Sequence, residues 1–218
     1  MSEERLRGRA GALAENMSRS LTVPTATTIR EFSVGSFVQW RLALQSQGSP
    51  VPVISCLAYA LVSAIKEEVP AMRCRLELRG DAFWKVDDDQ INLGIAVDVQ
   101  SGNSRSVMVP VVHGADQLSF TELNIRISQL AEACRSGTIN VSDLKGANVV
   151  LTSTGRFGAT GGVPRLPIGP GCIIAAGSIG IPPGLEVLAE SMPIQPVLMM
   201  TSTYDHRIIQ GSESGALL

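Results

Sequence analysis

Histidine, aromatic and charged residues are scarce in this chain of 218 residues. It contains two histidines, 4% aromatic residues and 17% charged residues. The 18 basic and 20 acidic residues give a net charge of −2, so we expect no binding of nucleic acid or of an anionic membrane surface. No apolar run approaches the roughly 20 residues that span a membrane, and the polar start lacks the apolar core of a signal peptide. These absences predict a cytoplasmic protein.

Cysteine is also rare, and its four positions are scattered at Cys56, Cys74, Cys134 and Cys172. The chain has no CxxC pair and no histidine at ligand spacing, which argues against a metal site. In a reducing compartment we expect free thiols. Cys134 and Cys172 lie in apolar patterns, so they are expected to be packing residues.

The remaining composition is that of one globular domain. Hydrophobic residues make up 44% of the chain, and neither an internal repeat nor a linker is visible. We expect a single domain over residues 1–218. Interleaved helices and strands with hairpins predict an α/β fold with a mixed sheet. The expected helices are 5–20, 37–45, 54–68 and 119–134. The expected strands are 25–29, 75–86 (a hairpin), 91–99, 107–112, 149–152, 172–176 and 197–203.

Two turns and one loop complete this prediction. Gly80-Asp81 should close the 75–86 hairpin, and Gly102-Asn103 should join the next two strands. The loop 155–170 is unusually long for a compact domain, and such loops usually carry function. Its glycines are not followed by Gly-Lys-Ser/Thr or by a helix, so they support neither a P-loop nor a dinucleotide site.

His206 is the better placed of the two candidate bases near neutral pH. It follows the apolar run 196–200 and is flanked by Tyr204, Asp205 and Arg207. The residues alone leave two interpretations open: a catalytic base, or a hydrogen-bonded histidine that ends a strand. The other histidine, His113, is expected to be a solvated loop residue.

Several motifs resemble one family. Residues 204–211, Tyr-Asp-His-Arg-Ile-Ile-Gln-Gly, resemble the Y-D-H-R-x-x-D-G signature of the dihydrolipoyl acyltransferase catalytic domains of 2-oxo acid dehydrogenase complexes. Chloramphenicol acetyltransferases share a shorter form. Residues 91–98, 140–146 and 151–158 resemble the family's V-N-I-G-V-A-V-D, L-x-x-x-D-L-x-G and F-T-I-S-N-L-G-x-F-G segments. The form with Gln210 in place of aspartate resembles the acyltransferase domain of actinobacterial 2-oxoglutarate dehydrogenases.

The resemblance implies a fold and a reaction. The fold would be the chloramphenicol acetyltransferase-like two-layer sandwich, with helices packed on a mixed sheet. His206 would act as general base and the Thr152 hydroxyl as donor to the oxyanion, with a coenzyme A thioester as cosubstrate. The acyl group would pass directly to the acceptor without a covalent acyl-enzyme. Ser153 is a possible contact for coenzyme A, and no metal is implied.

The resemblance also implies supporting residues and an assembly. Asp205, Arg207 and Arg7 would surround the site, and Gln210 would keep hydrogen bonding while losing the charge of the family's aspartate. Family members place the histidine of one subunit opposite the oxyanion donor of its neighbour, so we expect a homotrimer. The family usually continues beyond Leu218 with a final helix, which is a second departure.

Three functions remain open at this stage. Because no lipoyl or subunit-binding domain precedes Arg7, the first expectation is transfer of acetyl from acetyl-CoA to a hydroxyl of a small-molecule acceptor, such as a tetronate in antibiotic biosynthesis, with no bound lipoyl group. The alternative is a dehydrogenase-complex core that moves succinyl or acetyl between lipoamide and coenzyme A. A non-catalytic trimeric scaffold is the third possibility.

Overall fold

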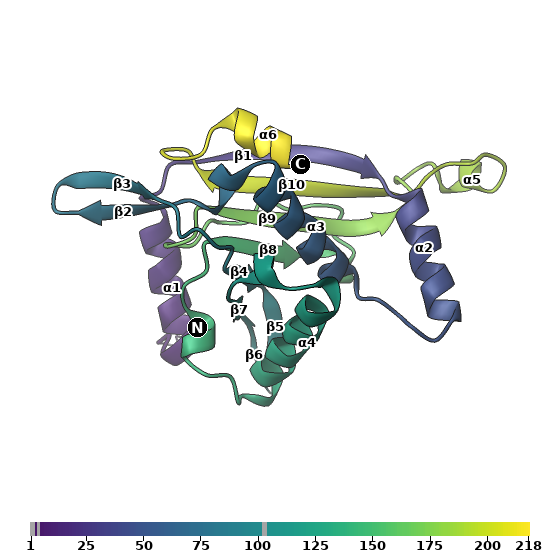
Figure 1. Cartoon of the computed structure of the whole chain (residues 1–218). Coiled ribbons are helices and arrows are strands. Elements are labelled where there is room, and N and C mark those ends of the chain that lie inside the picture. Colours follow the sequence, from purple (N-terminus) through teal and green to yellow (C-terminus); the bar gives the residue numbers. More distant parts are fainter. Residues whose placement is uncertain (1–2, 4, 102–103) are drawn as a thin grey trace.

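The structure, a computed structural model, describes residues 3, 5–101 and 104–218 (Figure 1). The α-helices are α1 (Gly8–Ser20), α2 (Gly35–Ser46), α3 (Val53–Glu67), α4 (Phe120–Ser136), α5 (Glu186–Ala189) and α6 (Gly211–Leu217). The strands are β1 (Thr25–Ser33), β2 (Arg75–Arg79), β3 (Ala82–Val86), β4 (Leu93–Ile95), β5 (Val97–Ser101), β6 (Ser104–Met108), β7 (Val111–Val112), β8 (Val149–Ser153), β9 (Cys172–Gly180) and β10 (Val197–Asp205).

A six-stranded mixed sheet forms the centre of the molecule, in the order β1-β10-β9-β8-β4-β7. β8 runs parallel to both β9 and β4, while β1, β10 and β7 pair antiparallel with their neighbours. β2–β3 and β5–β6 form two separate hairpins. The predicted α/β fold with a mixed sheet packed by helices is therefore confirmed.

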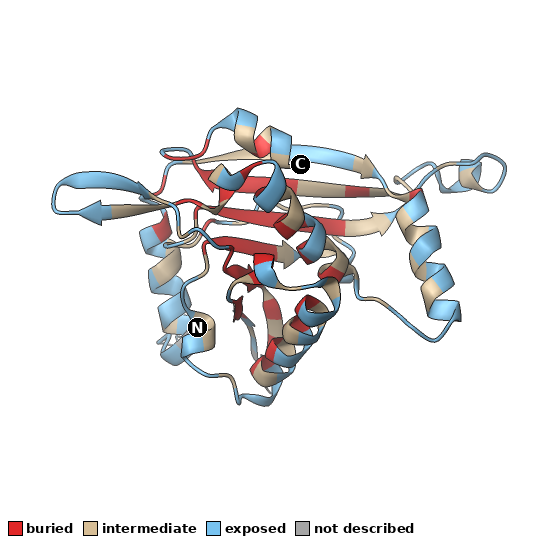
Figure 2. Cartoon of the chain, in the orientation of Figure 1, coloured by how far each residue is buried: buried red, intermediate tan, exposed pale blue. Residues whose placement is uncertain are grey.

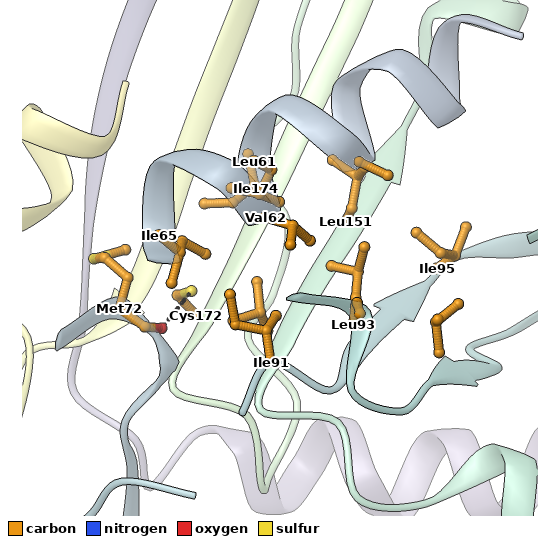
Figure 3. Close-up of a cluster of buried hydrophobic side chains, with 14 of the residues drawn as sticks. Leu61, Val62, Ile65, Met72, Ile91, Leu93, Ile95, Leu151, Cys172 and Ile174 are labelled. Atoms are coloured by element: carbon orange, nitrogen blue, oxygen red, sulfur yellow. Dashed lines mark hydrogen bonds between the residues drawn. The ribbon is translucent and has the colours of Figure 1, made fainter. Parts of the chain in front are cut away.

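The main core lies between the sheet and the helices α3 and α4. Leu61, Val62 and Ile65 of α3 point toward Leu151 and Ile174 of the sheet (Figure 3). Helix α4 adds three buried side chains, Leu123, Ile127 and Leu130. Its start is fixed by a capping box, in which Ser119 and Glu122 bond each other's backbone N–H groups.

The opposite face of the sheet carries a second, smaller cluster. Side chains alternate along a strand, so Leu151 of β8 enters the main core while Val150 and Thr152 face the other way. Val150 packs there with Val23, Leu166 and Ile173. This second face carries the candidate site.

Buried residues gather on the central strands, whereas the β2–β3 hairpin, α2 and α5 are largely exposed at the periphery (Figure 2). The hairpin turns at Gly80, which has φ +60°, as the Gly80-Asp81 pair predicted. Within the residues the structure describes, no helix is long and apolar enough to cross a membrane.

Two of the strand predictions were wrong in detail. The expected strand 91–99 is divided between β4 in the main sheet and β5 in a hairpin, and 107–112 is divided between β6 and β7. Pro110 lies at the second division because it has no N–H to continue a ladder. Its carbonyl instead accepts from Ile95 N at 2.9 Å. The expected turn at Gly102-Asn103 lies outside the described residues.

The C-terminal end also differs from expectation, because the chain has a short final helix, α6. Its glycines and serines have low helix propensity, so the sequence pattern did not reveal it. Tertiary contacts hold it in place: the buried Ser214 hydroxyl donates to Ser202 Oγ at 2.8 Å. The loop 155–170 contains one short 3₁₀ turn (Gly155–Phe157) and is otherwise irregular, as predicted.

Candidate active site

His206 follows β10 directly, in the turn that leads to α6. Its backbone N–H donates to the Pro24 carbonyl at 3.0 Å, and its ring contacts the buried Tyr204 ring edge-on at 5.6 Å. The ring Nδ1 lies 3.1 Å from the Ile209 carbonyl oxygen. A carbonyl can only accept, so Nδ1 carries a proton in this contact, and in the neutral ring it is Nε2 that has the lone pair. Since the side chain is exposed, this Nε2 is available to an incoming acceptor.

Asp205 and Arg207 fix the turn that carries His206. The buried Asp205 carboxylate accepts from Arg207 Nε at 2.8 Å, from Nη2 at 2.6 Å and from the Arg207 backbone N–H at 3.1 Å. These bonds raise the pKa of Arg207 above its ordinary value. The Arg207 guanidinium also lies 5.8 Å from the centre of the Phe83 ring, on the β2–β3 hairpin. Arg207 is therefore bound to Asp205 through both its side chain and its backbone N–H.

Gln210 occupies the N-cap position of α6. Its backbone N–H donates to the Glu213 carboxylate at 2.6 Å, so the residue fixes the start of that helix. Arg7 is exposed at the N-cap of α1, and no hydrogen bond joins it to Gln210 in the described structure. Gln210 thus lies four residues after His206, and in the described structure it forms no hydrogen bond with Arg7 or Arg207.

Thr152 lies near the end of β8, half-buried, where it lines a cavity of about 900 Å³. Within the described part of the chain its hydroxyl has no hydrogen-bond partner, so it is free to donate to a bound molecule. Ser153 follows on the strand with an exposed side chain and, by the alternation of strand residues, faces the other side of the sheet. It is not part of the cavity lining.

The loop 155–170 is packed tightly against β9 and forms one wall of this cavity. The Ser178 N–H donates to the Ala159 carbonyl at 2.8 Å, and the Thr201 hydroxyl donates to the Gly162 carbonyl at 2.6 Å. A Cβ on Gly177 would overlap the carbonyl of Thr160, so glycine is required for this close approach. The predicted functional loop therefore shapes the site that contains Thr152.

The cavity has an apolar floor and a polar rim. Val111, Val150 and Ile173 form its floor and are buried, while Lys145 and Arg165 line it with exposed side chains. The sequence prediction missed these residues. Val107, Val109 and Val111 alternate along the sequence, which indicates one continuous apolar face. Because a single strand was expected over 107–112, this face was not recognised as part of a cavity lining.

One chain does not bring Thr152 and His206 together. Thr152 is level with Ala175 on β9, and Ala175 is level with Thr201 on β10, five residues before His206. Thr152 and His206 are therefore separated by two interstrand spacings across the sheet and by five residues along the strand, which together correspond to about 20 Å. The described residues also contain no group of three side chains that could hold a metal ion.

Comparison with known proteins shows the family to which the chain belongs. All 218 residues, 1–218, match the model of the family "2-oxoacid dehydrogenases acyltransferase (catalytic domain)". The chain belongs to this family. As a member of the 2-oxoacid dehydrogenase acyltransferases it is an acyltransferase, as predicted. The Multifunctional 2-oxoglutarate metabolism enzyme of Mycobacterium sp. (strain JLS) is 33% identical over 223 residues, which cover 98% of this chain but 18% of that protein. The chain therefore spans less than a fifth of the length of this relative.

Solved structures of this acyltransferase family show the same fold. A probable dihydrolipoamide acetyltransferase from Listeria monocytogenes is 25% identical, with a TM-score of 0.82 over 100% of this chain and 91% of that one. The dihydrolipoamide acetyltransferase of Azotobacter vinelandii is 24% identical, with a TM-score of 0.83 over 100% and 88%. A chloramphenicol acetyltransferase matches at a TM-score of 0.54 and 16% identity, over 93% and 90%. The expected chloramphenicol acetyltransferase-like fold is confirmed.

Proposed function

We propose that this domain transfers an acyl group between coenzyme A and a dihydrolipoyl thiol. The orientation of His206, with Nδ1 bound to the Ile209 carbonyl and Nε2 exposed, is the observation that carries this proposal. Membership in the family supports acyl transfer, and the dihydrolipoamide acetyltransferases among the similar structures support a lipoyl acceptor. The small-molecule hydroxyl acceptor, which we expected first from the sequence, receives no support from these relatives.

The reaction follows from the two polar groups. His206 Nε2 takes the proton from the acceptor thiol, and the resulting thiolate attacks the carbonyl carbon of the acyl-CoA thioester. Thr152 donates its hydroxyl hydrogen bond to the negative oxygen of the tetrahedral intermediate. The C–S bond to coenzyme A then breaks, and the imidazolium returns its proton to the leaving thiolate. The general base and the oxyanion donor each increase the reaction rate on the order of 10²-fold or more.

The site must be assembled from two copies of the chain. Both groups have to lie within hydrogen-bond distance of one reacting centre, whereas about 20 Å separates them in a single chain by strand geometry. His206 of one subunit would therefore face the Thr152 cavity of its neighbour. The proposed assembly is a homotrimer, the smallest ring in which every subunit has two different neighbours.

Gln210, which replaces the aspartate of the family's signature, and the Thr152 hydroxyl are both compatible with this chemistry. The Azotobacter enzyme was studied for the role of a serine, a histidine and an asparagine in its catalytic mechanism, the asparagine four positions after the histidine. Gln210 also stands four positions after His206 and likewise carries an amide. Thr152 offers a hydroxyl, as that serine does. These parallels support catalysis over the non-catalytic scaffold.

The test compares thiol and alcohol acceptors with acetyl-CoA and succinyl-CoA as donors. Transfer to dihydrolipoamide leaves the number of free thiols unchanged, so the S-acyl dihydrolipoamide is measured directly by chromatography. Transfer to an alcohol releases one net thiol, which a thiol reagent detects. We expect acyl dihydrolipoamide to form, and to disappear as coenzyme A is added in excess. Transfer to an alcohol with none to dihydrolipoamide would overturn the proposal.

A further inference from the structure

Tyr204 and His206 stand two residues apart at the end of β10. Side chains with this spacing in an extended chain point to the same side, and the bonding to the β1 side continues to His206, whose N–H donates to the Pro24 carbonyl. The centres of the phenol and imidazole rings are 5.6 Å apart, and the ring planes meet at 83°. This is the edge-to-face arrangement that aromatic pairs favour. The strand itself therefore brings the two rings into contact.

The phenol ring of Tyr204 is fixed in place, whereas His206 is exposed. Tyr204 is only 3% exposed and belongs to the main core. Its backbone lies in the sheet, level with Ala26 on β1 and with Cys172 on β9. The hydroxyl end of the ring reaches the start of α6, because a Cβ placed on Gly211 would lie 3.5 Å from the phenol oxygen. The sheet and α6 thus hold the phenol at its two ends, and it offers the imidazole a fixed surface.

The contact of Nδ1 with the Ile209 carbonyl leaves the imidazole of His206 only partly restrained. The χ1 angle of an exposed histidine has three staggered wells, and water competes with the carbonyl for the N–H group. A second contact, with the Tyr204 ring, favours the same well. An edge-to-face pair changes the population of such a well by about three- to tenfold. The two contacts together therefore hold the ring in a single orientation.

We propose that Tyr204 is a positioning residue, which acts on the reaction only through the imidazole of His206. Its ring keeps Nδ1 at the Ile209 carbonyl, and so keeps the lone pair of the neutral imidazole on Nε2. This inference rests on the proposed function, in which His206 is the general base, and adds the side chain that orients this base before the acceptor binds. The phenol hydroxyl has no part in this role. Phenylalanine should therefore replace Tyr204, and an aliphatic side chain should not.

The experiment reads the proton position directly, which is simple because the chain contains only two histidines. The exposed His113 is changed in a tag-free parent variant, His113→Gln, so that His206 gives the only ring signals after ¹⁵N labelling of histidine. Ring ¹⁵N chemical shifts, recorded at a pH where the ring is neutral, show which nitrogen carries the proton. The parent and Tyr204→Phe should carry it on Nδ1, whereas Tyr204→Leu should show a mixture of both tautomers.

Steady-state kinetics with acetyl-CoA and dihydrolipoamide give a second readout. In Tyr204→Leu, kcat should fall by about three- to tenfold, because a smaller fraction of the enzyme has its base correctly oriented. Both KM values should stay within about twofold of the parent, since Tyr204 contacts neither substrate in this role. Tyr204→Phe should restore kcat to within about twofold of the parent.

Tyr59→Leu is the matched control. Tyr59 is the other tyrosine of the chain, and its ring makes an edge contact of the same geometry with Phe120, at 5.6 Å and 88°. Removing this contact should leave the His206 tautomer and kcat unchanged. Circular dichroism checks that each variant is folded.

An unchanged tautomer in folded Tyr204→Leu would overturn the inference, as would equal losses of kcat in Tyr204→Leu and Tyr204→Phe. If Tyr204→Leu does not fold, the parent protein decides. A nuclear Overhauser contact between the Tyr204 and His206 rings, with the proton on Nδ1, supports the inference, and its absence or a proton on Nε2 overturns it. If no acceptor is acylated, the proposed function fails, and the ring signals still decide whether Tyr204 orients His206.

Discussion

The ring of His206 is held by the carbonyl oxygen of Ile209, 3.1 Å from Nδ1 and three residues further along the chain. In the neutral ring this contact selects the tautomer whose lone pair is on Nε2. The buried Asp205, bound to Arg207, lies in the same turn. A base with a fixed tautomer on a rigid turn is prepared for proton transfer before any acceptor arrives.

The first prediction concerns this base. His206→Ala should lower kcat/KM by about 10³-fold, since the proton acceptor is lost, while leaving the fold intact because the side chain is exposed. Steady-state kinetics measure the loss of activity, and circular dichroism checks that the fold is intact. Gln210→Asp is the control: aspartate is also a good N-cap for α6, so activity should stay within about tenfold. Similar losses in both variants would mean that Gln210 takes part in the chemistry.

The second prediction concerns the oxyanion donor. Thr152→Val keeps the shape of the side chain but removes the hydroxyl, so kcat should fall by about 10²-fold or more. The Kd for acyl-CoA should change much less, because the hydrogen bond strengthens only as charge develops on the carbonyl oxygen. Ser153→Ala, outside the cavity lining, is the matched control. A loss confined to acyl-CoA binding in Thr152→Val would contradict the assignment.

The third prediction concerns a buried thiol. Complete burial raises the pKa of Cys172 to about 12, and its Sγ donates to the Met72 carbonyl at 3.3 Å. At pH 8 iodoacetamide should therefore label the half-buried Cys56 before Cys172, which should react only as the protein unfolds. Mass spectrometry of timed samples checks the order. The pKa of this thiol is higher in the folded protein than in the unfolded chain. Its contribution to stability is therefore complete below the ordinary pKa of 9.0 and is lost as the pH rises toward 12. Rapid labelling of Cys172 in the folded protein would refute its burial.

The fourth prediction concerns acid stability. Arg73 donates to Asp87 at 2.7 and 3.1 Å, and these bonds lower the pKa of that carboxylate. A lowered folded pKa means that the stabilisation is present above the unfolded pKa of about 3.9 and is lost as the pH falls through the folded value. Arg73→Gln should thus destabilise the protein more at pH 7 than below pH 3, measured by urea unfolding. Arg156→Gln, an exposed cation without an ion pair in the described structure, should show no such pH dependence.

The sequence was sufficient to predict the fold class, because apolar periodicity and the family motifs cover almost the whole chain. The helices 54–68 and 119–134 match α3 and α4 closely, since both have a buried face and a capping box marks the start of α4. The division of 91–99 and 107–112 between two sheets escaped prediction because strand pairing depends on partners elsewhere in the chain, such as Leu151. Helix α6 escaped because its stability comes from tertiary contacts.

The same limit applies to the site. His206 and Thr152 were identifiable from their motifs, but their separation depends on the sheet order β10-β9-β8, which no local pattern records. Lys145 and Arg165 lie on different loops and line the same cavity only because of the fold. For such residues, sequence spacing carries little information about distance.

The central claim is that His206 and Thr152 act across two copies of the chain, and complementation tests it most directly. His206→Ala and Thr152→Val chains, each nearly inactive alone, are mixed in equal amounts under denaturing conditions and refolded together. In a cyclic trimer about a quarter of the interfaces would then pair an intact His206 with an intact Thr152, so about a quarter of the wild-type activity should return. If the mixture stays as inactive as the separate variants although the subunits have exchanged, the site does not form between subunits and the account is contradicted.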